Sequence, residues 1–230
     1  MEQGIKGEAY DKYQEFKNNQ NVKVSNEDFE TMIVSDIFNK EDIDFLYEWV
    51  ESVPEENIKV MEWGGLKAWH HPLPERIVDK INESVKKNIG DMLVLRQDSS
   101  FARYDQSTGW KNKLHPHTDT RPSQRVTFDI QIKTDDRWGI IVEDKKYYLE
   151  DGQALVFAGT QQNHWREKKN IPKGSITDMI FCHLEWVDDQ PLDENQKEIL
   201  GQRSRFLGEF YDIHGNDVPY TEEIGENNEA

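Results

Sequence analysis

Apolar and polar residues alternate in short runs between residues 100 and 187. A period of two is typical of strands that bury one face, and turn sequences such as Asp151-Gly152 separate the runs. The pattern predicts strands over six segments: 100–104, 114–119, 125–133, 139–142, 153–157 and 176–187. Short strands that follow one another every 10 to 25 residues, without a long helix between them, predict a double-sheet jelly roll.

Two amphipathic helices are predicted ahead of these strands. The first begins after Asn39, a favoured N-cap residue, carries apolar residues at i, i+3, i+4 and i+7 from Ile43, and ends before Pro54. The second begins at Pro74, has one apolar face, and ends near Gly90. Helices in this position would cover one sheet, so the predicted fold class is mainly β with flanking helices.

The chain divides into four parts. Residues 1–25 form a polar N-terminal segment, and residues 26–190 hold the jelly roll with its N-terminal helices. Residues 191–212 predict a C-terminal amphipathic helix, which either braces the barrel or contacts a second subunit in a homo-oligomer. Residues 213–230 are acidic and lack periodicity, so we expect a disordered tail.

Composition indicates a soluble enzyme. A chain of 230 residues and 27.1 kDa is long enough for one domain with a sizeable core. The mean hydropathy of −0.89 and the absence of an apolar run near 18 residues exclude a membrane span. The polar start has no signal-peptide pattern, and the single Cys182 cannot form an internal disulfide, so we expect a cytoplasmic protein.

The net charge of −17 is spread unevenly. Residues 100–175 carry 13 basic and 10 acidic residues, a net charge of +3, while the remainder carries −20. An acidic protein is poorly suited to neutralise phosphates, which argues against a nucleic-acid partner. The basic barrel region either attracts an anionic co-substrate or simply has lysines on solvated faces.

The sequence His117-Thr118-Asp119 is the strongest chemical signal in the chain. Residues i and i+2 of a strand project to the same face, so the imidazole of His117 and the carboxylate of Asp119 converge. His164 follows 45 positions after Asp119 in another strand-like segment. Two His and one carboxylate on one face of an octahedron is the ligand set of non-haem Fe(II) oxygenases. We therefore expect these three residues to bind the metal at a catalytic centre.

The chain resembles the 2-oxoglutarate and Fe(II)-dependent dioxygenases, in the branch of prolyl-4-hydroxylase-like enzymes. The resemblance covers about Ile33 to Val187 and depends on an ordered series rather than on one motif. The series is Arg103-Tyr104, Pro116-His117-Thr118-Asp119, Leu149 to Gly159, His164-Trp165-Arg166-Glu167 and Phe181-Cys182-His183. It implies a double-stranded β-helix, the jelly-roll form in which this family places its metal at the mouth.

The resemblance also implies the chemistry. Fe(II) would be the metal, 2-oxoglutarate and O2 the co-substrates, and ascorbate an optional reductant. The 2-oxoglutarate would occupy two of the three open metal positions and O2 the third. The expected reaction hydroxylates a C–H bond of a peptidyl residue such as proline, or of a small metabolite, with release of succinate and CO2. The protein would supply geometry and exclude water.

The far carboxylate of 2-oxoglutarate needs a cation, and two candidates stand. Lys173 with Ser175 lies nine residues beyond His164, close to the position where prolyl-4-hydroxylase-like enzymes use a lysine. Pro172-Lys173-Gly174 is also an ordinary turn sequence. Arg166 lies at i+2 from His164, which would aim its fork to the same interior side. Tyr104 matches a family position where a phenol reaches the co-substrate.

Two other classes of protein fit the same ligand types, because His and Asp also suit zinc. One is a cupin-like jelly-roll enzyme of another chemistry, such as an isomerase or a zinc hydrolase. The other is a jelly roll that binds a ligand without catalysis. Only the oxygenase needs Lys173 or Arg166 aimed at a dicarboxylate beside the metal. No motif of the sequence encodes the primary substrate.

Overall fold

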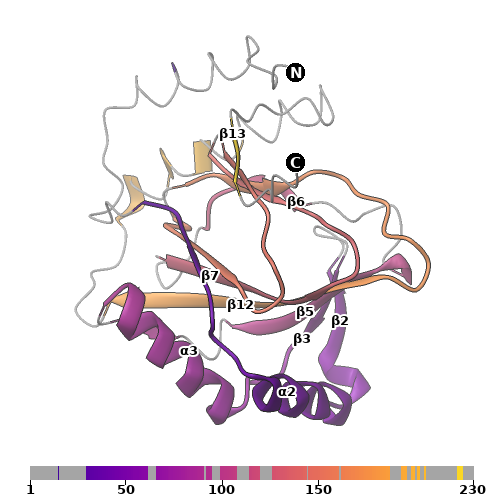
Figure 1. Cartoon of the computed structure of the whole chain (residues 1–230). Helices are drawn as coiled ribbons and strands as arrows, with labels where there is room; N and C mark the ends of the chain where they lie inside the picture. Colours follow the sequence, from indigo (N-terminus) through magenta and orange to yellow (C-terminus); the bar gives the residue numbers. More distant parts are fainter. Residues whose placement is uncertain are drawn as a thin grey trace, which may run out of the picture.

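A computed structural model of the chain describes residues 30–61, 66–90, 92–94, 99–107, 114–119, 126–143, 145–160, 162–186 and 222–224, with isolated positions at 15 and between 193 and 205. The core consists of a larger and a smaller β-sheet, and two helices cover the outer face of the larger one (Figure 1). Among the described residues, neither helix is long and apolar enough to span a membrane.

All strand pairings of the larger sheet are antiparallel, in the order β1-β10-β7-β12-β5-β3-β2, and β4 also pairs with β12. The long strand β12 lies at its centre between β7 and β5. The bounds are β1 Met32–Val34, β2 Ile58–Met61, β3 Leu66–Trp69, β4 Met92–Val94, β5 Ser100–Asp105, β7 Val126–Thr134, β10 Ala154–Phe157 and β12 Ile176–Trp186.

The smaller sheet has the order β13-β9-β8-β11-β6. Its pairings are antiparallel except the parallel contact between β13 and β9. The bounds are β6 Leu114–His117, β8 Ile140–Val142, β9 Lys145–Tyr147, β11 His164–Arg166 and β13 Glu222–Ile224. Apolar side chains of β8 and β9 pack against Leu155 and Phe157 of β10, which joins the two sheets through a shared core.

Helices α2 (Lys40–Ser52) and α3 (Glu75–Asn88) lie side by side on one face of the larger sheet, and a short 3-10 helix, Glu55–Asn57, follows α2 (Figure 1). Asn39 caps α2 through a capping box. The Asn39 side chain accepts from the backbone N–H of Asp42, and the Asp42 carboxylate accepts from the backbone N–H of Asn39. Asp42 also accepts from Arg76 of α3. Gly90 follows α3 with a φ of 135°, which favours glycine.

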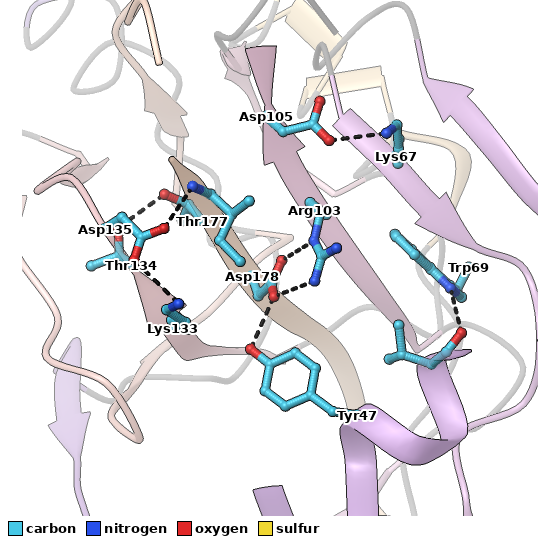
Figure 2. A network of polar contacts seen from close by, with 12 residues as sticks. Tyr47, Lys67, Trp69, Arg103, Asp105, Lys133, Thr134, Asp135, Thr177 and Asp178 are labelled. Carbon is cyan, nitrogen blue, oxygen red and sulfur yellow. Dashed lines mark hydrogen bonds and ion pairs between the residues drawn. The ribbon is translucent and has the colours of Figure 1, made fainter. Parts of the chain in front are cut away.

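A polar network fastens α2 to the sheet (Figure 2). Asp178 of β12 is fully buried and opposes Arg103 of β5 in the strand register. Its two carboxylate oxygens accept from Nε and Nη2 of Arg103 at 2.6 and 2.7 Å, and Oδ2 also accepts from the Tyr47 hydroxyl of α2 at 2.9 Å. The Trp69 indole of β3 also donates to Val50 O of α2 at 3.3 Å, and apolar side chains fill the space around these contacts, so this face is a packed structural core.

The opposite face of the larger sheet points toward the smaller sheet. Strand alternation puts Phe101 and Arg103 of β5 on the helix side and Tyr104 on the inner side. Along β7, the apolar residues face the helices, while Thr127 and Asp129 line a cavity between the sheets. This arrangement confirms the predicted fold class, a mainly β chain with flanking helices and a double-stranded β-helix core.

The six predicted strand segments match β5, β6, β7, β8, β10 and β12, and both predicted helices are present. The segments β1, β2, β3, β4 and β9 were not predicted. The tail expected to be disordered contains β13, whose Ile224 packs against the core shared by β8, β9 and β10. Residues 1–25 and most of the predicted helix over 191–212 lie outside the described residues.

Candidate metal centre

The three predicted metal ligands meet at one edge of the smaller sheet. His117 is the last residue of β6, and His164 is the first residue of β11. The antiparallel register places the two histidines opposite each other, and their ring centroids are 4.1 Å apart. Asp119 follows β6 by two residues, and its backbone N–H donates to Gly159 O at 2.8 Å.

The ligand atoms of this triad lie within reach of a single ion. Nε2 of His117 is 3.9 Å and Nε2 of His164 is 3.8 Å from Oδ1 of Asp119, and all three ligand atoms lie within 4.8 Å of one another. Two ligand atoms bonded to one ion at about 2.0–2.2 Å lie about 3 Å apart at right angles and at most about 4.4 Å apart, so these atoms would draw together by roughly 1 Å around a bound ion. The donor set fits a divalent metal, and its spacing requires only this small adjustment.

Neighbouring groups orient each ligand. Nδ1 of His164 lies 3.1 Å from Gln162 O, and a hydrogen bond there leaves Nε2 as the atom that faces Asp119. The Thr127 hydroxyl of β7 donates to Oδ2 of Asp119 at 2.6 Å, so Oδ1 remains directed at the histidines. His183 of β12 adds a further imidazole, with Nδ1 at 3.9 Å from Oδ2 of Asp119.

Electrostatics favour the metal-binding protonation states of His164 and Asp119. Burial first and the neighbouring His117 next lower the pKa of His164, which is about 3 despite the opposing effect of Asp119. Burial opposes ionisation of Asp119, but the three histidines and the Thr127 hydrogen bond outweigh it and hold the pKa of that carboxyl below its ordinary value. A neutral imidazole and a carboxylate are the forms that bind metals.

Gly159 supplies space that no other residue can. A Cβ at this position would lie 2.2 Å from both Oδ2 of Asp119 and Oγ1 of Thr127. The backbone of Gly159 must come this close because its carbonyl accepts from the Asp119 N–H. Gly159 thus fixes the backbone of Asp119, and Thr127 of β7 fixes its side chain.

The triad opens into a cavity of about 240 Å³ between the sheets. One end of the cavity holds the metal ligands, and the β2 and β3 side is mainly apolar, with His70 nearby. Besides the triad, the lining residues are Met61, Leu66, Ala68, His70, Ser100, Tyr104, Leu114, Thr127, Asp129, Phe181 and His183. The described lining includes neither lysine nor arginine.

The predicted co-substrate residues are placed very differently. Tyr104 is fully buried and lines the cavity, and its hydroxyl has no hydrogen-bond partner among the described residues. Arg166 is 1% exposed, with its guanidinium 5.9 Å from the Tyr104 ring centroid. Lys173 is exposed in the turn that joins β11 to β12, which the bond from Ser175 N to Pro172 O closes. The structure brings Arg166 close to Tyr104, but Arg166, Lys173 and Ser175 are all absent from the described cavity lining.

Several site residues were not singled out from the sequence. Thr127 and Asp129 occupy polar positions of an alternating strand, a pattern that ordinarily marks a solvated face. Both are buried and line the cavity. Gly159 and His183 stood out only as the last residues of two segments of the ordered series. The signal for the first pair was their i, i+2 spacing on a strand that follows the metal motif.

No protein-family model matches the sequence, and no curated protein matches it either. Solved structures do resemble it. HygX from Streptomyces hygroscopicus, with nickel, 2-oxoglutarate and hygromycin B bound, is 9% identical and has a TM-score of 0.51, covering 70% of this chain and 84% of HygX. An oxidoreductase of the 2OG-Fe(II) oxygenase family from Burkholderia pseudomallei is 9% identical, with a TM-score of 0.48, covering 83% and 96% of the two chains.

A prolyl hydroxylase from Trichoplax adhaerens, in complex with a peptide fragment of hypoxia inducible factor, is 12% identical at a TM-score of 0.46, covering 83% and 93%. The likeness to HygX shows a common fold. At 9% identity this likeness concerns the fold alone.

Proposed function

We propose that this protein is a 2-oxoglutarate-dependent non-haem Fe(II) dioxygenase that hydroxylates a C–H bond. The observation that carries the proposal is the cluster of His117, Asp119 and His164 in the lining of a cavity between two sheets. The three ligands come from one edge of the smaller sheet, which leaves the cavity side of the ion for ligands other than protein. The fold that HygX shares supports the same conclusion.

The chain's own residues would hold the metal and shape its surroundings. His117, Asp119 and His164 would bind Fe(II), and Thr127 and Gln162 would orient two of these ligands. When bound, the metal with 2-oxoglutarate and O2 supplies the oxidising chemistry, with succinate and CO2 as products. Phe157, whose ring centroid lies 4.7 Å from that of His164, helps to exclude water from the inner side.

Arg166 is the better candidate for the cation that serves 2-oxoglutarate. Its guanidinium donates to Trp138 O at 2.8 Å and to Met179 Sδ at 3.0 Å, which uses two of its five N–H donors among the described residues. Burial lowers its pKa, yet arginine stays charged, so it places a positive charge beside Tyr104 inside the barrel. Lys173, in its exposed turn, is the weaker candidate.

The substrate would enter over the mainly apolar side of the cavity. Met61 and Leu66 from β2 and β3 and Phe181 from β12 line that side, while the triad holds the other end. A small metabolite or a peptidyl side chain such as that of proline fits a cavity of about 240 Å³ that presents apolar surface on one side.

Metal titration tests the centre itself. The purified protein should bind one Fe(II) or Mn(II) ion, and His164→Ala should abolish that site because it removes one of three protein ligands. His71→Ala is the matched control, since His71 is exposed and outside the cavity lining. An unchanged metal stoichiometry in His164→Ala would contradict the assignment.

Succinate release tests the reaction. With Fe(II), ascorbate, O2 and 2-oxoglutarate, the protein should release succinate slowly even without its primary substrate, and His164→Ala should release none. If no succinate forms and 2-oxoglutarate does not bind to the metal-loaded protein, the chain is a cupin-like jelly roll with another role.

Two variants decide between the cations. A charge-assisted hydrogen bond contributes about 1.5–3 kcal/mol, so Arg166→Met should weaken 2-oxoglutarate binding roughly 10- to 100-fold while the metal stays bound. Lys173→Met should bind 2-oxoglutarate like the wild type. Thermal unfolding of both variants checks that the buried substitution leaves the fold intact. The reverse result would restore Lys173 as the co-substrate residue.

A further inference from the structure

The inner face of β7 carries three polar residues at alternate positions, and one oxygen of the middle residue has no hydrogen-bond partner in the described part of the chain. Thr127 donates to the Asp119 ligand, and Gln131 donates to Leu149 O at 2.7 Å. Asp129 lies between them, 3% exposed, and its Oδ1 has no hydrogen-bond partner among the described residues. A buried carboxyl without a partner is rare and costly, so its presence in a cavity points to a ligand.

The two residues that pair with Asp129 across the neighbouring strands are apolar. The register places Leu155 of β10 opposite it on one side and Phe181 of β12 on the other. The charged and titratable groups that act on it come from other elements, namely Arg166 of β11, Tyr104 of β5 and Asp119 after β6. His183 of β12 also lines the same cavity.

This environment favours the neutral acid. Burial raises the pKa of Asp129 to about 8, the charge of Asp119 raises it too, and Arg166 opposes both. Near pH 7 the group is therefore largely a carboxylic acid, which can donate one hydrogen bond. A carboxyl kept neutral by an apolar site can serve as a donor to an anionic oxygen.

A second unpartnered polar atom shares the cavity. The Tyr104 hydroxyl is buried without a hydrogen-bond partner among the described residues, and the positive charge of Arg166 lies behind the Tyr104 ring. Burial raises the pKa of Tyr104 above its ordinary value, so this group also stays protonated. Two O–H groups, of Asp129 and Tyr104, thus line the cavity, and the guanidinium lies near the Tyr104 ring, outside that lining.

We propose that Asp129 binds 2-oxoglutarate as a neutral acid. Its O–H donates to the far carboxylate of 2-oxoglutarate, beside Tyr104 and Arg166. Each 2-oxoglutarate is therefore bound together with one proton. The proposal rests on the proposed function, because it takes 2-oxoglutarate as the ligand. No covalent bond changes. Where Asp129 is ionised, binding takes one proton from solvent, and release returns it.

The proposal predicts a specific pH dependence. Below the pKa of Asp129 the proton is already present, and affinity should not change with pH on its account. Above about pH 8 the proton must be taken up, so affinity should fall tenfold for each further pH unit. A 2-oxo acid that lacks the far carboxylate, such as 2-oxobutyrate, should show no such decline.

Calorimetric titration of the Mn(II)-loaded protein with 2-oxoglutarate, without O2, tests this from pH 6.5 to 9.5. Two buffers of different ionisation enthalpy at each pH report proton uptake directly. Asp129→Asn keeps a donor of the same shape without titrating, so its affinity should stay near the wild-type value at pH 7 and remain flat to pH 9.5. Asp129→Ala removes the donor and should bind about tenfold more weakly at pH 7.

Asp135→Asn is the matched control, because Asp135 is outside the cavity lining and its variant should keep the wild-type pH profile. A flat wild-type profile without proton uptake would overturn the proposal and leave the oxygenase function in place. An Asp129→Ala affinity equal to that of Asp129→Asn would also overturn it, since Asp129 would then only repel the ligand. If 2-oxoglutarate binds neither wild type nor variant at any pH, the proposed function itself fails.

Discussion

Two aspartates on adjacent strands of the larger sheet are both buried, and their surroundings are opposite in character. Asp178 of β12 points to the helices, where Arg103 and Tyr47 satisfy its oxygens. Asp129 of β7 points to the cavity, where Oδ1 has no partner among the described residues. An aspartate on the helix side of the sheet is therefore hydrogen-bonded, whereas one on the cavity side has an oxygen without a partner among the described residues.

The difference distinguishes buried polar groups that stabilise the fold from buried polar groups that can bind a ligand. A buried carboxylate that is paired and hydrogen-bonded to several elements fixes their relative positions. A buried carboxyl without a partner lowers stability and persists where another molecule uses it. The tyrosines repeat the contrast, because the Tyr47 hydroxyl donates to Asp178 while the Tyr104 hydroxyl faces the cavity without a partner among the described residues.

The largest expected effect is the loss of Asp178. Asp178→Ala leaves the guanidinium of Arg103, whose side chain is 26% exposed, without its bidentate acceptor. Removing one partner of a buried pair costs about 3–5 kcal/mol of unfolding free energy, which urea denaturation would measure. Asp129→Ala is the paired comparison and should cost little or stabilise the protein. Equal losses in the two variants would erase the distinction between the faces.

The second effect is a pH dependence of stability caused by Asp129. Its pKa is about 8 in the folded state and about 3.9 in an unfolded chain, so the folded state holds an extra proton between these values. The contribution of Asp129 to the unfolding free energy is therefore fully present below about pH 4. It declines toward pH 8, by at most about 1.4 kcal/mol per pH unit. Asp129→Asn should lack this decline when urea midpoints at pH 5 and pH 7 are compared with those of the wild type.

The smallest effect compares the two tyrosines. Tyr47→Phe removes a hydrogen bond to a charged group and should cost about 1.5 kcal/mol of unfolding free energy. Tyr104→Phe removes a hydroxyl without a partner among the described residues and should leave stability unchanged or raise it. The same Tyr104→Phe variant should bind 2-oxoglutarate more weakly, whereas Tyr47→Phe should not. A stability loss in Tyr104→Phe equal to that in Tyr47→Phe would show that its hydroxyl is structural.

The sequence predicted the framework and the metal ligands because both leave periodic signals. Strand alternation located β5, β7, β10 and β12, and capping and proline signals located α2 and α3. The His117-x-Asp119 spacing placed two ligands on one face, and the structure brings His164 to them. In each case a short-range rule of strand or helix geometry was sufficient.

The remaining site depends on long-range packing that no local rule describes. A polar residue on an alternating strand faces water in most sheets, so Asp129 could be read as a cavity residue only once the smaller sheet was placed over it. Lys173 became a candidate by counting from His164, and such counting does not reveal which side of a turn a lysine occupies. The need for glycine at position 159 arises from contacts with Asp119 and Thr127, which are far away in sequence.

The parallel strand β13 has a consequence for how the chain is made. It covers the outer edge of β9, and its register sets Glu222 and Glu223 opposite Lys145 and Lys146. An uncovered strand edge is a template for pairing with another molecule. During synthesis, β9 emerges long before residues 222–224 do, so its edge stays open while most of the chain is already outside the ribosome. Until residue 224 is in place, nascent copies of this chain on neighbouring ribosomes are therefore at risk of pairing with one another.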